Sequence, residues 1–255
     1  MYIQEISIEI NTEIDKEELL YEFDWLMGSY RQNGQTQGDF HCKYINENKI
    51  VWLPYTLEKD SLNEKYNNFY VNSQIKKIEE LCNSTILFKM VGKSCEDYES
   101  PCSCNTPEFY ILITNYISIS SPLKCGTCNK SVPLYRLPHY SDNGYYQVLS
   151  WMTNYISCDS LQMNCEVGER WALNQMQNVK SQLSKQGFKI CRRIEELTGI
   201  PTYYYLHNYK KVKGDESLKP CPICNGKWYL KKRMHNFYDF KCDKCKIIST
   251  ISPNR

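Results

Sequence analysis

The chain has 255 residues, of which 42% are hydrophobic and 24% charged, and its formal net charge is +2 at pH 7. This composition is ordinary for a soluble globular protein with one large domain or two to four small ones. The first residues, MYIQEISIEINTEID, lack the basic and apolar regions of a signal peptide. No uninterrupted apolar run approaches the ~20 residues needed to span a bilayer. We therefore expect a cytoplasmic protein without membrane contact.

The small net charge hides a difference between the two ends of the chain. Residues 1–30 carry eight acidic side chains and one basic side chain, a net of −7. Residues 207–255 carry twelve basic and four acidic side chains, a net of +8. Such asymmetry indicates two different partners, or one end that shields the other. Solvated faces that merely differ in charge are the alternative.

The first 95 residues alternate strand and helix patterns. YIQEISIEI has the period of two typical of a half-buried strand, and the next residues repeat apolar positions at helical spacing behind a capping Asp15. The later patterns predict a hairpin joined at NEN, a helix and a buried strand: FHCKYI and KIVWLPYT, SQIKKIEEL, and STILFKMV. The order β-α-β-β-α-β predicts a ferredoxin-like domain over residues 1–95.

The middle of the chain predicts two further segments. Residues 96–133 are cysteine-rich around a strand-like centre, FYILITNYISI, and predict a first zinc ribbon. Residues 134–206 predict a helical hairpin followed by a strand at PTYYYL. Apolar residues step by three or four from Glu166 to Leu197, which predicts one long helix ending at Gly199, and YYQVLSWMTNYI predicts its shorter partner.

Residues 207–255 carry the strongest chemical pattern of the chain. Clustered cysteines in a cytosolic protein of this length more often bind metal than form disulfides, and eight of the fourteen cysteines sit in four close pairs. The last two pairs follow C-x2-C-x17-C-x2-C: Cys221, Cys224, Cys242 and Cys245. This spacing predicts a tetrahedral Zn²⁺ site, with Pro222 and Gly226 supporting the turn. Four thiolates leave no open position, so we expect the ion to be structural.

An upstream pattern predicts a second structural zinc ion. Its four candidate ligands are Cys102, Cys104, Cys125 and Cys128. The second pair forms a good turn, which Gly126 eases. The first pair is unusual, because a single intervening residue points two side chains apart in an extended chain. Cys95 and His139 are the alternative ligands if either cysteine of that pair is free.

The C-terminal segment also interleaves aromatic and basic residues. Aromatic rings stack on unpaired bases, and lysine and arginine neutralise phosphates. The candidate nucleic-acid contacts are Trp228, Lys231, Lys232, Arg233, Phe237, Tyr238 and Lys241. The alternative is that a small ribbon buries aromatics around its zinc and keeps lysines outside, where they offset the charge of four thiolates. Both interpretations are open at this stage.

Several segments together resemble a bacterial family of unknown function. They are SPLKCGTCNKSVPLYRLP at 121–138, GIPTYYYL at 199–206, CPICNGKW at 221–228 and FYDFKCDKCKIISTIS at 237–252. That family is described as zinc-ribbon-containing and nucleic-acid-binding. The resemblance implies that Cys125 and Cys128 and the four C-terminal cysteines are metal ligands, and Cys102 and Cys104 match a C-x-C element of the family.

We therefore expect an α+β protein with a ferredoxin-like unit, a helical hairpin and two small zinc ribbons. The first functional hypothesis is a non-enzymatic zinc protein that binds DNA or RNA, because we find no nucleophile motif and no Gly-rich phosphate loop. The second is a protein-binding inhibitor, such as a bacterial toxin-immunity protein, that uses the acidic N-terminal face. No small-molecule substrate is evident.

Overall fold

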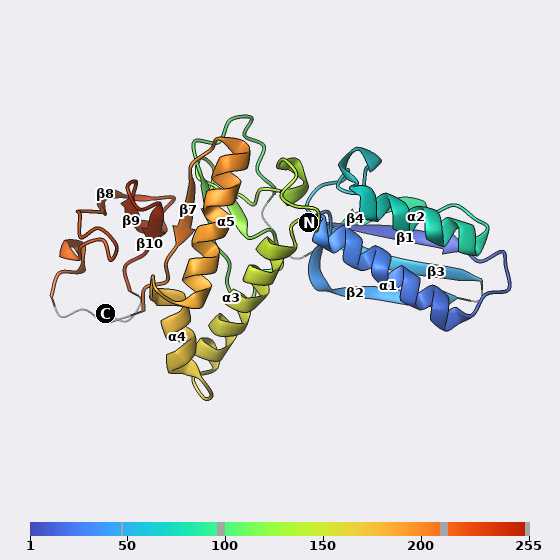
Figure 1. The fold of residues 1–255 in the computed structure, drawn as a ribbon, viewed down its shortest axis with the longest axis horizontal. Helices are drawn as coiled ribbons and strands as arrows, with labels where there is room; N and C mark the ends of the chain where they lie inside the picture. Colours follow the sequence, from blue (N-terminus) through green and yellow to red (C-terminus); the bar gives the residue numbers. More distant parts are fainter. Residues whose placement is uncertain (47, 96–99, 210–213, 253–255) are drawn as a thin grey trace. The chain divides into compact units, whose positions relative to one another are not determined.

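The computed structural model describes every residue except 47, 96–99, 210–213 and 253–255. The chain divides into two compact units (Figure 1). Unit 1 comprises residues 1–101, 119–121 and 131–146, and unit 2 comprises residues 102–118, 122–130 and 147–255. Three predicted segments lie partly outside the described residues. They are the start of the first ribbon, the NEN turn of the N-terminal β-hairpin and the linker after residue 207.

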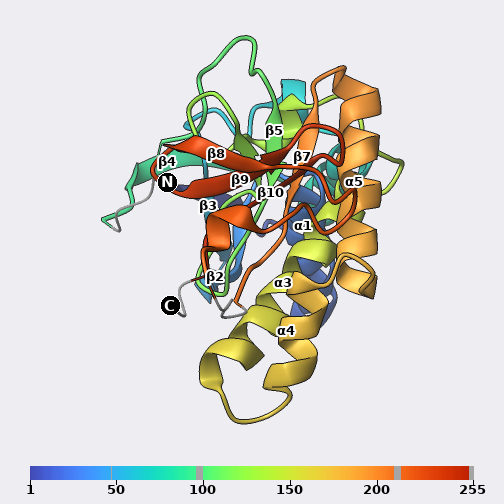
Figure 2. The same cartoon turned by 90° about the vertical axis from the view of Figure 1, so that its left-hand side faces the viewer.

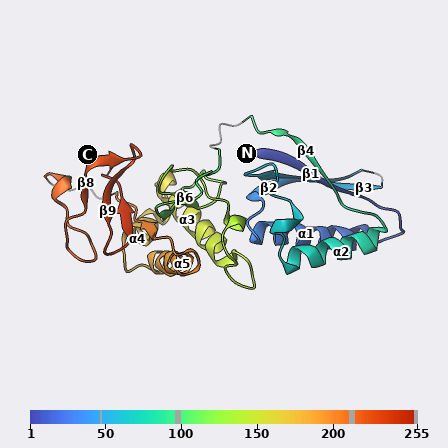
Figure 3. The same cartoon turned by 90° about the horizontal axis from the view of Figure 1, so that it is seen from above.

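Unit 1 has the predicted order of strands and helices. Its elements are β1 (Tyr2–Glu9), α1 (Lys16–Gln32), β2 (Gln37–Asn46), β3 (Lys49–Thr56), the short 3-10 helix η1 (Glu64–Tyr66), α2 (Phe69–Cys82), β4 (Leu87–Lys93) and the 3-10 helix η2 (Leu134–Arg136). The strands form one antiparallel sheet in the order β2-β3-β1-β4. Both helices cover one face of this sheet (Figure 3). Asp15 caps α1 as expected, since its side chain accepts a hydrogen bond from the Glu17 backbone N–H.

The core of unit 1 lies between the sheet and the two helices. Alternate residues of β1 and β3, such as Ile6, Ile8 and Trp52, are fully buried against Phe23 of α1 and Ile78 of α2. The strand predicted as buried at STILFKMV is different. It forms β4 at the edge of the sheet, where it pairs only with β1, and its side chains are mostly exposed. An edge strand has one neighbour fewer, which explains the exposure.

Unit 2 combines a second sheet with three helices. Its elements are β5 (Tyr110–Leu112), β6 (Leu123–Cys125), α3 (Tyr146–Asn164), α4 (Glu169–Gln177), α5 (Gln182–Thr198), β7 (Thr202–Tyr205), the 3-10 helix η3 (Glu216–Leu218), β8 (Tyr229–Met234), β9 (Tyr238–Cys242) and β10 (Ile247–Ser249). The six strands take the order β6-β5-β7-β10-β9-β8, and β7 runs parallel to both of its neighbours. Figure 2 shows β7, β10, β9 and β8 side by side. The two cysteine-rich segments therefore share one sheet, although the sequence suggested two separate small ribbons.

The region predicted as a helical hairpin contains three α-helices. The prediction of a single helix from Glu166 to Leu197 is wrong, because the chain leaves the helical conformation between α4 and α5. Asn178 is extended and ends α4, and Ser181 begins α5 by accepting a hydrogen bond from the Ser184 backbone N–H. Asn and Ser favour such breaks because their side chains bond to nearby backbone groups. The predicted end at Gly199 is confirmed, with φ of +69° at the helix C-terminus.

The tyrosine run of β7 is buried on both sides of the sheet. Tyr204 faces the helices, where its ring contacts the rings of Trp151 and Phe188. Tyr203 and Tyr205 face the other way and pack with residues that include Phe109 and Tyr238. A central strand between parallel neighbours is covered on both faces, which accounts for three consecutive buried rings. The described part of the chain contains no helix that is both long enough and apolar enough to cross a membrane.

Helix α5 approaches β7 closely because residue 187 is glycine. A Cβ atom at this position would lie 2.2 Å from a ring carbon of Tyr204 and 3.1 Å from Nε1 of Trp151. Gly28 of α1 offers a matched contrast, because a Cβ there would meet nothing within 4 Å. Both glycines sit inside helices, so their substitutions differ chiefly in the space available.

We predict opposite effects of alanine at these two glycines. Gly187→Ala should lower the free energy of unfolding by about 1–3 kcal/mol through overpacking. Gly28→Ala should raise it by about 0.5–1 kcal/mol, because alanine loses less backbone entropy in a helix. Thermal and urea unfolding followed by circular dichroism measure both. An unchanged stability of Gly187→Ala would contradict the described packing of α5 on β7.

Candidate metal centres

The C-terminal cysteines meet at one point of unit 2. Cys221 and Cys224 lie in the turn before β8, Cys242 ends β9, and Cys245 follows in the turn to β10. Their four sulfur atoms lie within 4.8 Å of one another, and the Sγ atoms of Cys224 and Cys242 are 3.7 Å apart. Tetrahedral metal–sulfur bonds of ~2.3 Å imply sulfur separations of about 3.8 Å. A disulfide would need ~2.05 Å, so this group fits a metal ion and not a disulfide.

The upstream cysteines form a second group of the same kind. Cys102, Cys104, Cys125 and Cys128 also place their sulfur atoms within 4.8 Å of one another. The one-residue spacing of the first pair is accommodated by a bend in which the Cys104 backbone N–H lies 3.3 Å from Cys102 Sγ. The alternative ligands Cys95 and His139 belong to neither four-cysteine group and are exposed. Both predicted sets of four cysteines can therefore hold a metal ion.

The three C-x2-C turns share one backbone conformation. The residue after the second cysteine has a positive φ in each turn: 59° at Asn129, 58° at Asn225 and 53° at Lys246. In the first two turns the backbone N–H of that asparagine donates to the carbonyl of the first cysteine, at 2.7 and 2.9 Å. The shape of the turn lets both sulfurs point toward one position. Asparagine tolerates positive φ better than most residues do, so it is a sequence signal for such a turn.

Gly126 has a different role from the expected one. The sequence suggested that it eases the turn, but its φ is not in the positive region. A Cβ at Gly126 would lie 2.3 Å from ring carbons of Phe109, so glycine is needed for the close approach of that ring. Gly226 meets only Cys224 Sγ, 3.4 Å from a built Cβ, and likewise has no positive φ.

The electrostatic surroundings of the sulfur atoms suit thiolates bound to a cation. A hydrogen bond from the Gly226 backbone and the neighbouring Cys245 thiol lower the pKa of Cys224 to about 7. Burial raises the pKa of Cys102, which favours its neutral thiol when no cation is present. Cys125 and Cys221 are fully buried. A metal ion compensates the charge of buried thiolates and displaces their protons, so metal binding and folding of this region should be coupled.

The two cysteine groups are connected through the turn between β8 and β9. His235 Nε2 donates to the carbonyl oxygen of Gly126 at 2.6 Å. The hydroxyl of Tyr238 donates to Oδ1 of Asn129 at 3.2 Å. Both acceptors belong to the Cys125–Cys128 turn. His235 is thus a link between the two groups and not a metal ligand.

Two of the predicted nucleic-acid contacts are buried, and a third, Lys241, is half-buried. Trp228 and Tyr238 are 4% and 1% exposed, so their rings cannot stack on bases without rearrangement. Trp228 packs on Phe240 and donates its Nε1–H to the Lys219 carbonyl. Lys241 lies over the rings of Phe109 and Tyr203 and pairs with Asp243 at 2.6 Å. The burial of Trp228 and Tyr238 favours the alternative interpretation, in which a small ribbon buries its aromatic residues, whereas Lys241 stays a predicted contact.

The other predicted contacts lie on the surface of the ribbon. Lys231, Lys232 and Arg233 occupy consecutive exposed positions of β8, which is the edge strand of the sheet. Arg233 pairs with Asp239 at 2.7 Å, whereas neither lysine has an ion pair among the described residues. Phe237 is 44% exposed, and Tyr229, which the sequence interpretation left out of the candidate contacts, is 43% exposed. The arrangement offers cations and aromatic rings on one short hairpin.

Comparison with known proteins gives three families of unknown function along most of the chain. Residues 1–92 match "Domain of unknown function (DUF8589)", residues 104–207 match "Domain of unknown function (DUF2310)", and residues 210–255 match "Domain of unknown function (DUF8594)". None of these descriptions names a metal or a ligand.

Two curated relatives come from Haemophilus influenzae, and each is named "Uncharacterized protein". One is 33% identical over 237 residues, which cover 90% of this chain and 89% of the relative. The other is 34% identical over 175 residues, or 66% of this chain and 82% of the relative. The chain therefore belongs to the family of the first of these Haemophilus influenzae proteins.

Proposed function

We propose that the protein is a non-enzymatic, zinc-binding protein that binds nucleic acid through strand β8 of its C-terminal ribbon. The observation that carries the proposal is the pair of exposed lysines on that strand, Lys231 and Lys232, on the same hairpin as the exposed rings of Tyr229 and Phe237. Such lysines neutralise phosphates, and such rings stack on unpaired bases. The buried Trp228 and Tyr238 take no part in this proposal.

The chemistry of the ligands supports zinc as the metal. Four thiolates in a tetrahedral arrangement are typical of structural zinc or of iron–sulfur centres, and paired C-x2-C turns within a hairpin are typical of zinc. We infer that both ions are structural, because four protein ligands leave no position for a substrate. Fourteen free cysteines in addition favour a reducing compartment such as the cytoplasm.

The arrangement of unit 1 supports a ferredoxin-like class for the N-terminal domain. The order β-α-β-β-α-β with the strand sequence β2-β3-β1-β4 is the arrangement expected for it. We infer that this domain, the middle helices and the C-terminal ribbon are parts of one protein with a binding function.

The lysines of β8 have a competing explanation, since lysines on an edge strand also prevent unwanted pairing with other sheets.

We predict that the purified protein contains two zinc ions per chain. Cys221→Ser should leave one zinc and destabilise the C-terminal ribbon, because binding at such sites contributes on the order of 10 kcal/mol to folding. Cys42→Ser, which alters an exposed cysteine outside both groups, should leave two zinc ions and unchanged stability. Mass spectrometry of the metal content measures each case. Iron in place of zinc, or an unchanged metal content in Cys221→Ser, would contradict the assignment.

We predict that nucleic-acid affinity depends on the lysines of β8. The double variant Lys231→Glu/Lys232→Glu should weaken binding to all sequences, because it removes two phosphate contacts. It should also reduce the slope of log K against log salt by about 1.4–1.8. Fluorescence anisotropy with labelled single- and double-stranded DNA and RNA across salt concentrations measures both effects.

A matched control separates local contact from net charge. Lys185→Glu/Lys189→Glu makes the same charge change at two exposed positions of α5. This variant should keep the affinity and the salt slope of the unmodified protein. Equal losses in both double variants, or no binding of any nucleic acid at low salt, would remove the proposed role of β8.

A second candidate function is supported by one observation on α1. Tyr21 and Trp25 are 60% and 54% exposed, and their rings meet edge to face at 6.2 Å. The acidic side chains of Glu17 and Glu18 are exposed on the same helix. Exposed Trp and Tyr beside acidic groups fit an interface with a basic protein, such as a toxin that an immunity protein neutralises.

The second candidate predicts protection of cells from a basic toxin. Expression of this protein should rescue growth when a toxin encoded beside its gene is produced, and Trp25→Ala should weaken the rescue by removing an interfacial ring. Lys76→Ala, at an exposed position of α2, is the control and should protect fully. Growth curves with and without toxin measure the effect, and absence of any rescue would discard this candidate.

A further inference from the structure

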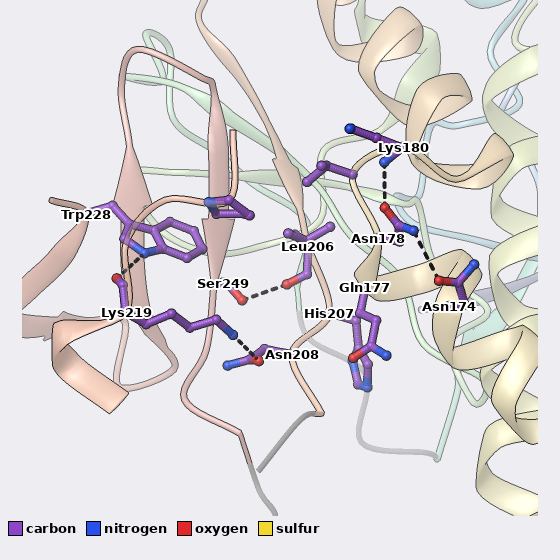
Figure 4. Close-up of a pocket in the computed structure, with 12 residues that line it drawn as sticks. Asn174, Gln177, Asn178, Lys180, Leu206, His207, Asn208, Lys219, Trp228 and Ser249 are labelled. Carbon is purple, nitrogen blue, oxygen red and sulfur yellow. Dashed lines mark hydrogen bonds between the residues drawn. The ribbon is translucent and has the colours of Figure 1, made fainter. Parts of the chain in front are cut away.

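Unit 2 contains a cavity that neither cysteine group uses. It has a volume of about 470 Å³ and lies among the turn after α4, the end of β7 and the C-terminal ribbon (Figure 4). Its volume is within the range of about 300–1,000 Å³ typical of small-molecule sites. It also adjoins the carboxyl end of a strand with parallel neighbours, where ligands bind in many mixed sheets.

Hydrogen bonds fix the turn that forms one wall of this cavity. Asn178 Nδ2 donates to Asn174 Oδ1 at 3.1 Å, and the Lys180 backbone N–H donates to Asn178 Oδ1 at 2.9 Å (Figure 4). The Gln177 side chain lines the same wall and has no hydrogen bond to any described residue. An amide offers both donors and an acceptor, so Gln177 can bind a partner that carries both.

His207 supplies an unsatisfied polar atom at the cavity. Its Nε2 is buried and has no hydrogen-bond partner in the described parts of the chain. Burial lowers the pKa of His207 to about 4, so the imidazole is neutral near pH 7. Its ring lies nearly parallel to that of Tyr209, at 15° and 6.1 Å between centroids. A buried nitrogen without a partner is costly, and a ligand that completes its hydrogen bond would be favoured.

The charges around the cavity select an anionic ligand. Lys180 is exposed at its rim and has no ion pair with a described residue, and Lys219 Nζ donates to Asn208 Oδ1 at 2.8 Å. Among the residues that the structure describes, no carboxylate lines the cavity. Glu216 lies behind Asn208, where it accepts hydrogen bonds from Asn208 Nδ2 and from the Ser252 backbone N–H. The lining thus joins two ammonium groups to neutral groups that donate and accept hydrogen bonds.

We propose that this cavity binds a nucleoside monophosphate, with the phosphate at Lys180 and Lys219 and the base at Gln177 and His207. Lysines suit a phosphate, and a neutral imidazole and an amide suit the edge of a base. A free nucleotide and the phosphorylated end of a nucleic-acid strand share this chemistry. The proposal does not depend on contact between β8 and nucleic acid, because none of the four residues assigned to the nucleotide lies on β8.

Calorimetric titration of the zinc-loaded full-length protein with AMP, GMP, CMP and UMP tests the proposal. At least one nucleotide should bind with saturation. Lys180→Ala should weaken that binding about tenfold by removing a charge-assisted contact. Gln177→Ala and His207→Phe should weaken it as well, and the phenylalanine keeps an aromatic ring beside Tyr209. Lys185→Ala and Gln182→Ala, at exposed positions of α5 outside the cavity, are the controls and should bind as the unmodified protein does.

Two further ligands complete the experiment. A 5′-phosphorylated decanucleotide that binds more tightly than the mononucleotide, and loses affinity in Lys180→Ala, identifies the strand end as the source. Equal affinities for the decanucleotide and the mononucleotide identify the free nucleotide as the ligand. Either result supports nucleotide binding in the cavity. Inorganic phosphate should bind more weakly than the preferred nucleotide. Absence of saturable nucleotide binding, equal binding of inorganic phosphate, or binding that no cavity variant changes would overturn the proposal. The Lys231→Glu/Lys232→Glu variant should keep mononucleotide binding, so failure at β8 and failure at the cavity are distinguishable.

Discussion

Unit 2 depends on the convergence of eight cysteine sulfurs into two tetrahedral groups. The small strands β5, β6, β8, β9 and β10 have three to six residues each, and strands of that length bury little apolar surface alone. A metal ion in each group would join the ends of these strands and fix their register. The hydrogen bonds from His235 to Gly126 and from Tyr238 to Asn129 then hold one group against the other. The edge strand β8 and the cavity beside β7 belong to the same unit as both groups.

The sequence predicted the cysteine groups and the order of elements in unit 1 better than it predicted how the segments of unit 2 join in one sheet. Four close cysteine pairs, three of them C-x2-C and one C-x-C, identified all eight members of the two groups, because ligation of one ion by two nearby cysteines requires a short turn that is visible in the sequence. The element order of unit 1 was equally visible, because its amphipathic periods are long and regular. The joining of both cysteine groups in one sheet was not, because it depends on β7 pairing with β5 and β10, which are distant in sequence.

The remaining differences have physical causes at particular residues. The break between α4 and α5 depends on capping by Asn178 and Ser181, and the apolar spacing continues through it, so periodicity alone joins the two helices. The aromatic residues of the ribbon looked like stacking platforms, but Trp228 and Tyr238 provide the core that a small hairpin lacks. No sequence pattern around His207 indicated a binding role for it. Its unsatisfied Nε2 becomes apparent only when the surrounding cavity is formed.

We propose that each cysteine group coordinates one zinc ion through four sulfur atoms. X-ray absorption spectroscopy at the zinc edge of the purified full-length protein tests it most directly, because it reports the identity and distance of the bound atoms. We expect a single shell of four sulfur atoms at about 2.3 Å, without nitrogen or oxygen ligands. A shell that includes nitrogen or oxygen, or fewer than four sulfur atoms per zinc, would contradict it and would mean that a cysteine of one group is not a ligand.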